Sequence, residues 1–373
     1  MGEWSEMDKR RRQILKSGVI ALASCAIPSP LMAQVTNANK VIDLKMAGYP
    51  YEHVQGIITK RVGIDRCDTT FEVDKIGNLN THLFSGPQTR GISEVGLSPF
   101  ILAFANEEFR DYSLIPVFPL RTFRHKSIFV RTDSNFSDPL QLRGKRIGTP
   151  GYSSTSLTWI RGILQDEYGL TPEDIEWVVS AEDSAVADTG QVSKFENVFP
   201  EGLAVSTGPA GKDDSDLLLD GYVDALFHAA EPRAFAEGNP NIRRLFTDVR
   251  NVEQAYFSKT GIFPIMHAVA IRNDLVAQHP WLPEAVFNAY SKSKVMAYSE
   301  SRQKWFYRTL PWHAQELEAT EELMGENFLP YGIEANRKAL NALFRYQHEQ
   351  GLASRQLTIE EVFTASTLEL TES

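Results

Sequence analysis

The α/β character of the chain is clearest over Leu142–Val178, which reads LRGKRIGTPGYSSTSLTWIRGILQDEYGLTPEDIEWV. Residues 143–148 lead into a short strand, and a turn rich in hydroxyl groups follows at residues 151–156. Residues 155–167 then have the amphipathic spacing of a helix. Thr171–Asp174 (TPED) begins another helical turn, with Thr as N-cap and Pro at the first position. A strand, a turn and a helix in close succession predict an α/β unit.

The same alternation extends over the rest of the chain. Short apolar runs predict further strands at residues 41–46, 114–118 and 127–130, a strand-and-turn region at 91–102 and a strand end at 224–227. From Pro283 onward the pattern is mostly helical. Strands that alternate with helical segments predict sheets covered by helices.

Length and charge narrow the classes of function. A chain of 373 residues, 42% of them hydrophobic, is long enough for two lobes that each bury a core. Its 38 basic and 48 acidic residues give a net charge of −10, and no basic cluster occurs after the first sixteen residues. Binding to nucleic acid requires clustered Lys and Arg, so nucleic acid is not expected as a partner.

The N-terminus has the features of an export signal. Lys9–Lys16 reads KRRRQILK and precedes the short apolar stretch GVIALASCAIP, and the small residue Ala33 stands at the expected cleavage boundary Ala33-Gln34. A basic region, an apolar region and a small-residue boundary predict a signal peptide over residues 1–33. The pair Arg11-Arg12 predicts the twin-arginine type and a periplasmic protein. A lipid anchor at Cys25 is left open.

Several cofactor motifs are missing from the sequence. It contains neither a Walker loop nor GxGxxG, and neither paired cysteines nor closely spaced histidines mark a zinc site. We therefore predict no cofactor and no metal, although a site built from scattered His and carboxylate residues is left open. Cys67 alone cannot form an internal disulfide in the mature chain.

The segment 142–178 resembles the second-lobe entrance of type II periplasmic binding proteins, and more specifically the 4,5-dihydroxyphthalate decarboxylase family that shares this fold. The resemblance extends over residues 44–369. It is carried by further segments, namely PVFPLRTFRH (116–125), NIRRLF (241–246), KTGIFPIMH (259–267), ELEATEELMG (316–325), PYGIEANR (330–337) and QGLASRQLTIEEVFTASTLE (350–369).

The resemblance implies two lobes with a ligand cleft between them. The predicted division is a signal peptide over residues 1–33, lobe 1 over 34–140 and 255–373, and lobe 2 over 141–254. Two crossings should connect the lobes, near residues 126–140 and 250–270.

Two guanidinium groups and an imidazole follow one another closely at Arg121, Arg124 and His125. A guanidinium binds a carboxylate through two hydrogen bonds, so Arg121 and Arg124 are candidate ligand-binding residues. Without the resemblance, a solvated surface turn is the favoured interpretation of this segment. With it, His125 is the first candidate for a catalytic acid.

Other candidates lie at predicted strand ends or at the crossings. His228 follows a predicted strand, where ligands bind in open α/β sheets. His267 follows an apolar run beside Phe263, where a lone histidine is more often a core residue, but this segment should cross the cleft. Tyr152, Ser154 and Thr155 precede a helix whose free N–H groups suit an anion, or they simply cap it. Tyr49 lies in the turn after the first strand. Glu94 is expected to orient a histidine or a ligand hydroxyl, or to cap a helix.

Two classes of function remain. The resemblance implies a lyase that decarboxylates a hydroxylated aromatic dicarboxylate without an oxidant, with a histidine as proton donor. The alternative is an exported receptor that binds a small, aromatic carboxylate and delivers it to a membrane transporter. Both need clamps for anions, but only the lyase needs an acid.

Overall fold

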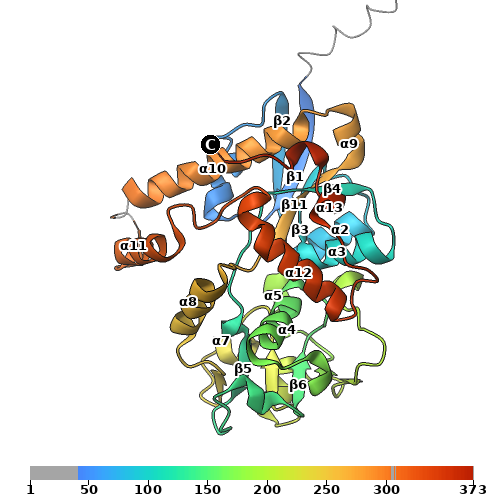
Figure 1. The fold of residues 1–373 in the computed structure, drawn as a ribbon, viewed down its shortest axis with the longest axis vertical. Coiled ribbons are helices and arrows are strands. Elements are labelled where there is room, and N and C mark those ends of the chain that lie inside the picture. Colours follow the sequence, from blue (N-terminus) through green and yellow to red (C-terminus); the bar gives the residue numbers. More distant parts are fainter. Residues whose placement is uncertain (1–40, 304–305, 307, 373) are drawn as a thin grey trace, which may run out of the picture. The chain divides into compact units, whose positions relative to one another are not determined.

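Two β-sheets organise the chain in the computed structural model, which describes residues 41–303, 306 and 308–372 (Figure 1). Each sheet has helices packed against it and forms one lobe. This arrangement confirms the predicted two-lobed α/β fold. The predicted signal peptide and Cys25 lie outside the described residues.

The first sheet has five strands in the order β2-β1-β3-β11-β4. These are β1 (Ile42–Gly48), β2 (Cys67–Val73), β3 (Ile92–Gly96), β4 (Tyr112–Ile115) and β11 (His267–Arg272). β1 pairs with β2 and β3 in parallel, whereas β11 is antiparallel to β3 and β4. A strand from late in the chain therefore lies inside a sheet built mainly from early residues.

The second sheet has six strands in the order β10-β5-β9-β6-β7-β8. These are β5 (Ile128–Arg131), β6 (Arg146–Thr149), β7 (Glu176–Val179), β8 (Val205–Thr207), β9 (Ala225–Phe227) and β10 (Ile242–Arg244). β9, β6, β7 and β8 run parallel, so their carboxyl ends share one edge. Loops that follow these strands are placed to build a site at that edge.

The helices follow the predicted alternation. Those in the first two thirds of the chain are α1 (Gln55–Ile58), α2 (Ile76–Phe84), α3 (Leu97–Asn106), α4 (Thr155–Tyr168), α5 (Val186–Thr189), α6 (Asp214–Leu219), α7 (Arg233–Ala236) and α8 (Val249–Thr260). The later ones are α9 (Asn273–Gln278), α10 (Leu282–Gln303), α11 (His313–Met324), α12 (Arg337–Glu349) and α13 (Ile359–Val362). None of the described helices has both the length and the apolar character needed to cross a membrane.

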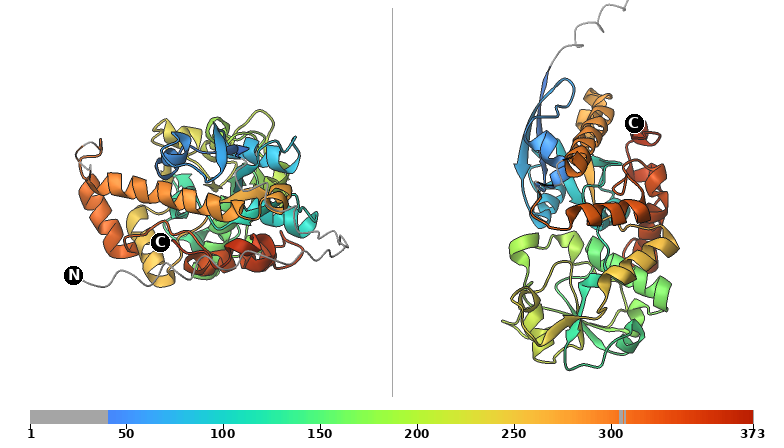
Figure 2. Two further views of the ribbon diagram at one scale, coloured as in Figure 1. Left: turned by 90° about the horizontal axis from the view of Figure 1, so that it is seen from above. Right: turned by 90° about the vertical axis from the view of Figure 1, so that its left-hand side faces the viewer.

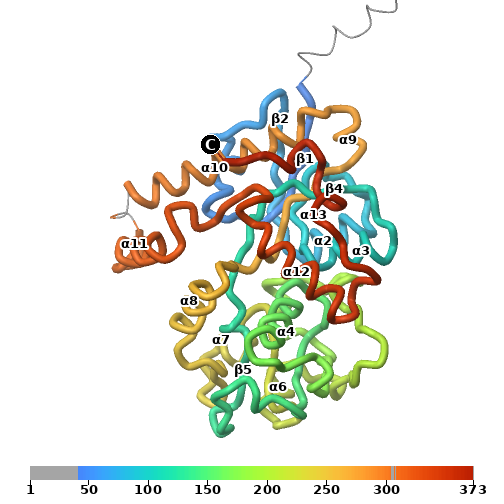
Figure 3. Tube along the Cα trace, viewed as in Figure 1, coloured from blue at the N-terminus to red at the C-terminus, as the bar shows by residue number. Residues whose placement is uncertain are grey.

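Two segments pass between the sheets, one between β4 and β5 and one between α8 and β11 (Figure 3). They lie side by side, because Arg121 and Ile265 form an antiparallel bridge and Thr122 N donates to Pro264 O at 3.1 Å. β5 belongs to the second sheet, so the boundary predicted at residue 140 is too late in the chain. An apolar run such as 128–131 indicates a strand, but strand propensity does not indicate which sheet it joins.

The C-terminal helices pack on more than one part of the molecule. α10, the long orange helix in Figure 2, packs against α1, where Gly56 N donates to Ser293 Oγ at 3.1 Å. α12 packs against both α3 and α4. At the α4 contact a Cβ on Gly162 would lie 2.3 Å from the Tyr346 ring, so only glycine allows this close approach.

The ends of α4 show why this helix has its observed bounds. Ser154 caps its N-terminus, accepting a hydrogen bond from Leu157 N, and Gly169 ends it in the left-handed conformation with φ of 64°. Trp159 is fully buried and donates from Nε1 to Ile265 O at 2.9 Å. α4 is thereby held against the returning crossing, with its N-terminus at the cavity described next.

Candidate active site

A cavity of about 150 Å³ lies between residues that come from both sheets. The first lobe contributes residues at strand and helix ends, namely Tyr49, Ile76, Gly77, Gly96, Leu120 and His267. The second lobe contributes Arg124, Pro150, Gly151, Ser154, Thr155, Ser156, Leu157, Asp183, Thr189, Gly190, Gln191, Val192, Glu196, His228 and Ala229. A cavity of about 150 Å³ is the size known to accept one benzene ring.

Glu94 and His267 form a buried pair on one side of the cavity. β3 and β11 are paired strands, and this pairing brings His267 Nδ1 to 2.6 Å from Glu94 Oε1. Because the carboxylate accepts from Nδ1–H, Nε2 is the ring nitrogen left for a ligand. No hydrogen bond from the described residues engages Nε2, and His267 lines the cavity. The structure thus brings together two of the predicted site residues.

Two tyrosines next to β1 hold the Glu94 carboxylate in place. Tyr51 Oη donates to Glu94 Oε1 at 2.7 Å, and Tyr49 N donates to Oε2 at 2.8 Å. Burial and the Glu94 charge keep the pKa of Tyr51 far above its usual value, so Tyr51 remains a donor. Sequence reasoning missed Tyr51, although it stands two residues after Tyr49 in the same turn.

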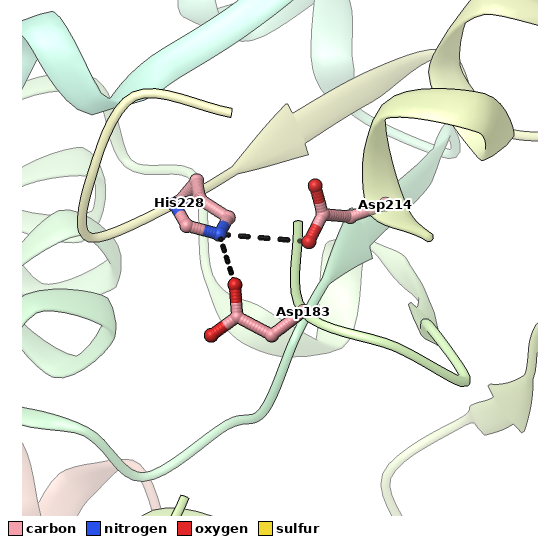
Figure 4. Close-up of side chains that lie close together, drawn as sticks. All are labelled: Asp183, Asp214 and His228. Atoms are coloured by element: carbon pink, nitrogen blue, oxygen red, sulfur yellow. Dashed lines mark hydrogen bonds and ion pairs between the residues drawn. The ribbon is translucent and has the colours of Figure 1, made fainter. Parts of the chain in front are cut away.

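His228 lies on the second lobe between two carboxylates (Figure 4). Its Nε2 is 3.0 Å from Asp183 Oδ1 and 3.5 Å from Asp214 Oδ2. Burial alone lowers the pKa of His228, but hydrogen bonds to these two carboxylates raise it to about 10. Burial raises the pKa of Asp183, but the hydrogen bond to His228 and its charge outweigh burial, so this pKa lies below its usual value.

Arg124 lines the cavity without a carboxylate partner among the described residues. Its guanidinium donates from Nη1 to Ala229 O at 2.6 Å and from Nε to Met266 Sδ at 3.2 Å. Burial lowers the pKa of Arg124 to about 9, and the Glu253 charge opposes this only in part. A buried cation of this kind favours an anionic ligand, since buried charges are normally paired.

The N-terminus of α4 forms another side of the cavity. Ser154 and Thr155, from the hydroxyl-rich turn, both line it. Thr155 Oγ1 accepts from Ser98 N at 3.0 Å, which ties this turn to the first lobe. The positive end of the helix dipole therefore adds to the charge of Arg124.

The prediction that His125 faces the cleft is wrong for this structure. Its ring packs between Phe246 and Tyr256, with ring centroids 5.5 and 5.1 Å away, and burial lowers its pKa to about 4. His125 follows Arg124 directly, but it begins a short 3₁₀ turn over His125–Ser127, in which successive side chains point in different directions. Only one of the two therefore reaches the cavity, and that one is Arg124.

Three other predicted site residues also lie away from the cavity. Arg121 is buried at the crossings, where Nη2 donates to Phe263 O at 2.6 Å and Nη1 to Asn336 Oδ1 at 2.7 Å. Phe263 stacks on another ring at the crossing, and Tyr152 lies beneath the guanidinium of Arg161, 3.7 Å from it. Each satisfies a packing or hydrogen-bonding need inside the protein.

Asp183 and Asp214 were not predicted as site residues. Asp183 follows β7, His228 follows β9, and these parallel strands end at the same edge of the sheet. The rule that identified His228 would also have identified Asp183. Asp214 begins α6 within a loop rich in Gly and Asp, and sequence alone did not distinguish it from its acidic neighbours.

The chain is similar to curated and structurally characterised proteins, although no protein-family model matches it. A 4,5-dihydroxyphthalate decarboxylase from Comamonas testosteroni is 32% identical over 329 residues, which cover 88% of this chain and 98% of that enzyme. Another from Pseudomonas putida is 28% identical over 58% of this chain and 81% of its own length.

The fold is shared with a solved structure at much lower sequence identity. The periplasmic aliphatic sulphonate binding protein SsuA from Escherichia coli matches 88% of this chain and 99% of its own with a TM-score of 0.51, at 14% identity. This likeness supports the type II periplasmic-binding-protein fold. The sequence identity to the Comamonas enzyme over nearly its whole length goes further: the chain belongs to the 4,5-dihydroxyphthalate decarboxylase family.

Proposed function

We propose that this protein removes one carboxylate from a hydroxylated aromatic dicarboxylate, with 4,5-dihydroxyphthalate as the first candidate substrate. The observation that carries the proposal is the Glu94–His267 pair: His267 lines the same cavity as Arg124, and within the described residues its Nε2 has no hydrogen bond and Arg124 has no carboxylate partner. A proton donor and a carboxylate anchor are the two groups that such a reaction needs. The substrate named for the related enzymes supplies the two carboxylates.

Arg124 and the N-terminus of α4 would hold the carboxylate that stays on the ring. Nη1 and Nε of Arg124 are used within the protein, which leaves Nη2 for the ligand. The first turn of α4 lines the same cavity through Thr155 and Ser156, and the positive end of the helix dipole lies there. The anion is thereby fixed while the second carboxylate lies toward His267.

The reaction requires one proton and no change of oxidation state. His267, protonated at both nitrogens, donates from Nε2 to the ring carbon that bears the leaving carboxylate. The hydroxyl group para to that carbon stabilises the resulting cation. The bond from the ring to the carboxylate then breaks, its electrons restore the aromatic ring, and CO2 leaves. Glu94 keeps its hydrogen bond to Nδ1–H throughout and stabilises the charged imidazole before the transfer.

Apolar side chains complete the cavity and support loss of CO2. Ile76, Leu120 and Leu157 line it beside the polar groups. A carboxylate that loses water in such surroundings is destabilised relative to neutral CO2.

The test is to incubate purified protein with 4,5-dihydroxyphthalate and to measure CO2 and 3,4-dihydroxybenzoate, which should form in equal amounts. His279→Gln changes a histidine that does not line the cavity, and this control should retain wild-type turnover. Tight binding of the dicarboxylate for hours without CO2 would contradict the lyase.

That contrary result would instead favour a receptor. The shared fold with a sulphonate binding protein and the anion-binding groups of the cavity both suit a carrier of a small aromatic carboxylate. A receptor would deliver its ligand to a membrane transporter and would use His267 only for binding. Turnover is what distinguishes the two functions.

We also propose that the protein is exported to the periplasm. The proposal rests on the pair Arg11-Arg12 and the apolar stretch after it. Replacing both arginines by lysine should leave the precursor in the cytoplasm, as cell fractionation would measure. Normal periplasmic levels in this variant would contradict a twin-arginine signal. If Cys25 carries a lipid, Cys25→Ala should release the protein from the membrane fraction.

A further inference from the structure

Three potential metal ligands meet at the cavity wall of the second lobe. His228 Nε2, Asp183 Oδ1 and Asp214 Oδ2 lie within 4.8 Å of one another. The distances from Nε2 to the two oxygens are 3.0 and 3.5 Å. An ion with bonds of about 2.1 Å separates its ligands by about 3.0 Å at right angles and about 3.4 Å at tetrahedral angles. The two distances from Nε2 fit an ion bound by His228 together with each carboxylate.

The surrounding hydrogen bonds orient the three groups as ligands. His228 Nδ1 lies 3.0 Å from both Ala230 O and Ala230 N; with an ion at Nε2, Nδ1–H would donate to Ala230 O, the kind of main-chain partner that commonly fixes a metal-bound imidazole. The outer oxygens of the carboxylates accept from hydroxyl groups, Asp214 Oδ1 from Ser184 and Asp183 Oδ2 from Thr189. The inner oxygens each accept one main-chain N–H, from Ser184 and Ala185, and keep a second lone pair.

The position of the cluster leaves one side open. Asp183 and His228 line the cavity, whereas Asp214 is fully buried behind them. Three protein ligands with an open side are typical of a catalytic metal site. The two carboxylates carry a charge of −2, which one divalent ion neutralises.

We propose that Asp183, Asp214 and His228 bind one divalent transition-metal ion, such as Zn²⁺ or Mn²⁺, whose open positions face the cavity. The oxygen atoms of the bound ligand would complete its coordination. Metal binding itself does not depend on the proposed reaction; only the identity of the ligand, a hydroxylated aromatic acid, rests on the proposed function. The hydroxyl groups of such an acid would lie toward the ion while its carboxylates lie toward Arg124 and His267.

The experiment titrates chelator-treated protein, after removal of the chelator, with ZnCl2 or MnCl2 in a calorimeter. Wild-type protein should bind one equivalent. Co²⁺ should give the visible absorption bands of a protein-bound ion with nitrogen and oxygen ligands. Asp183→Asn and His228→Gln should each weaken Zn²⁺ binding at least tenfold. Asp216→Asn is the matched control, because Asp216 lies on α6 near Asp214 but pairs with Arg233 instead, and it should bind like wild type.

Several results would overturn the proposal. If folded wild-type protein binds none of Zn²⁺, Mn²⁺ and Co²⁺, the proposal is overturned, and no variant is needed to show it. Wild-type binding by folded Asp183→Asn and His228→Gln proteins would place the ion elsewhere. Asp183 lies at the cavity rather than in the core, so its variant should fold even if a change at Asp214 does not. Stoichiometric metal binding without CO2 release would leave the metal site intact and refute the lyase. CO2 release by protein that binds no metal would support the lyase and refute the metal site.

Discussion

Two histidines reach the same cavity from opposite lobes, and they differ in what surrounds them. His267 contacts one carboxylate through Nδ1 and keeps Nε2 free, whereas His228 has its Nε2 between two carboxylates and its Nδ1 at the main chain of Ala230. A histidine with a free nitrogen can exchange a proton with a ligand. One with both nitrogens engaged holds a fixed charge or an ion. The contacts, rather than the residue type, decide the role.

The largest expected effect tests the proton-donating side of this comparison. His267→Gln should lower kcat for CO2 release by about 10²–10⁴-fold, because a general acid typically contributes that much. The Kd for the dicarboxylate should change little, since Arg124 and α4 are intact. Steady-state kinetics and calorimetry together measure the two effects. A variant that loses affinity but retains kcat would show that His267 only binds.

The anion anchor should give the next effect. Arg124→Gln should weaken binding of the dicarboxylate about ten- to a hundredfold, the loss of a charge-assisted contact of about 1.5–3 kcal/mol. Arg244→Gln is the control, because Arg244 pairs with Glu231 and does not line the cavity. Calorimetry measures the Kd of the dicarboxylate for wild type and for both variants. Equal affinities would mean that Arg124 has a purely structural role.

The fixed charge of His228 should appear in the pH dependence of stability of metal-free protein. The pKa of His228 in the folded protein is about 10, above its ordinary value. Its charge therefore stabilises the fold fully below about pH 6.5, and this stabilisation is lost as pH rises toward 10. Urea unfolding in the presence of EDTA should show a smaller loss over this range for Asp183→Asn than for wild type. Parallel curves would show that His228 is not charged in the folded protein.

The smallest effect should come from the tyrosine that supports Glu94. Tyr51→Phe removes the 2.7 Å hydrogen bond to Oε1, but the contacts of Oε1 with His267 and of Oε2 with Tyr49 N remain. We expect kcat to fall less than tenfold, with the Kd unchanged. Turnover assays measure this difference. A loss as large as that of His267→Gln would mean that Tyr51 itself takes part in proton transfer.

Most of the fold was predictable, because strands and helices leave periodic patterns of apolar residues. The boundary between lobes was not, because the pairing of β5 with β9 and β10 joins residues from distant parts of the sequence. The local pattern of apolar residues does not indicate which distant strands pair. The prediction placed β5 in the wrong lobe for this reason.

The site was predicted in part, and the failures have particular causes. Glu94 was expected to orient a histidine, and it contacts His267. His125 was placed in the cleft because it follows Arg124, but it begins a 3₁₀ turn, and its ring packs against Phe246 and Tyr256 instead. Asp183 and Asp214 escaped notice because each lies in a loop with other acidic residues, and only the fold brings them to His228.

The position of β11 in the first sheet has a consequence for the order in which the protein forms on the ribosome. β11 lies between β3 and β4, yet it begins at His267, after every strand of the second sheet has been translated. The second lobe has all of its strands by Arg244 and can assemble its sheet first. The first lobe, although translated earlier, lacks an interior strand until much later. The lobe that emerges first therefore finishes last, and its exposed strand edges must be protected from aggregation in the interval.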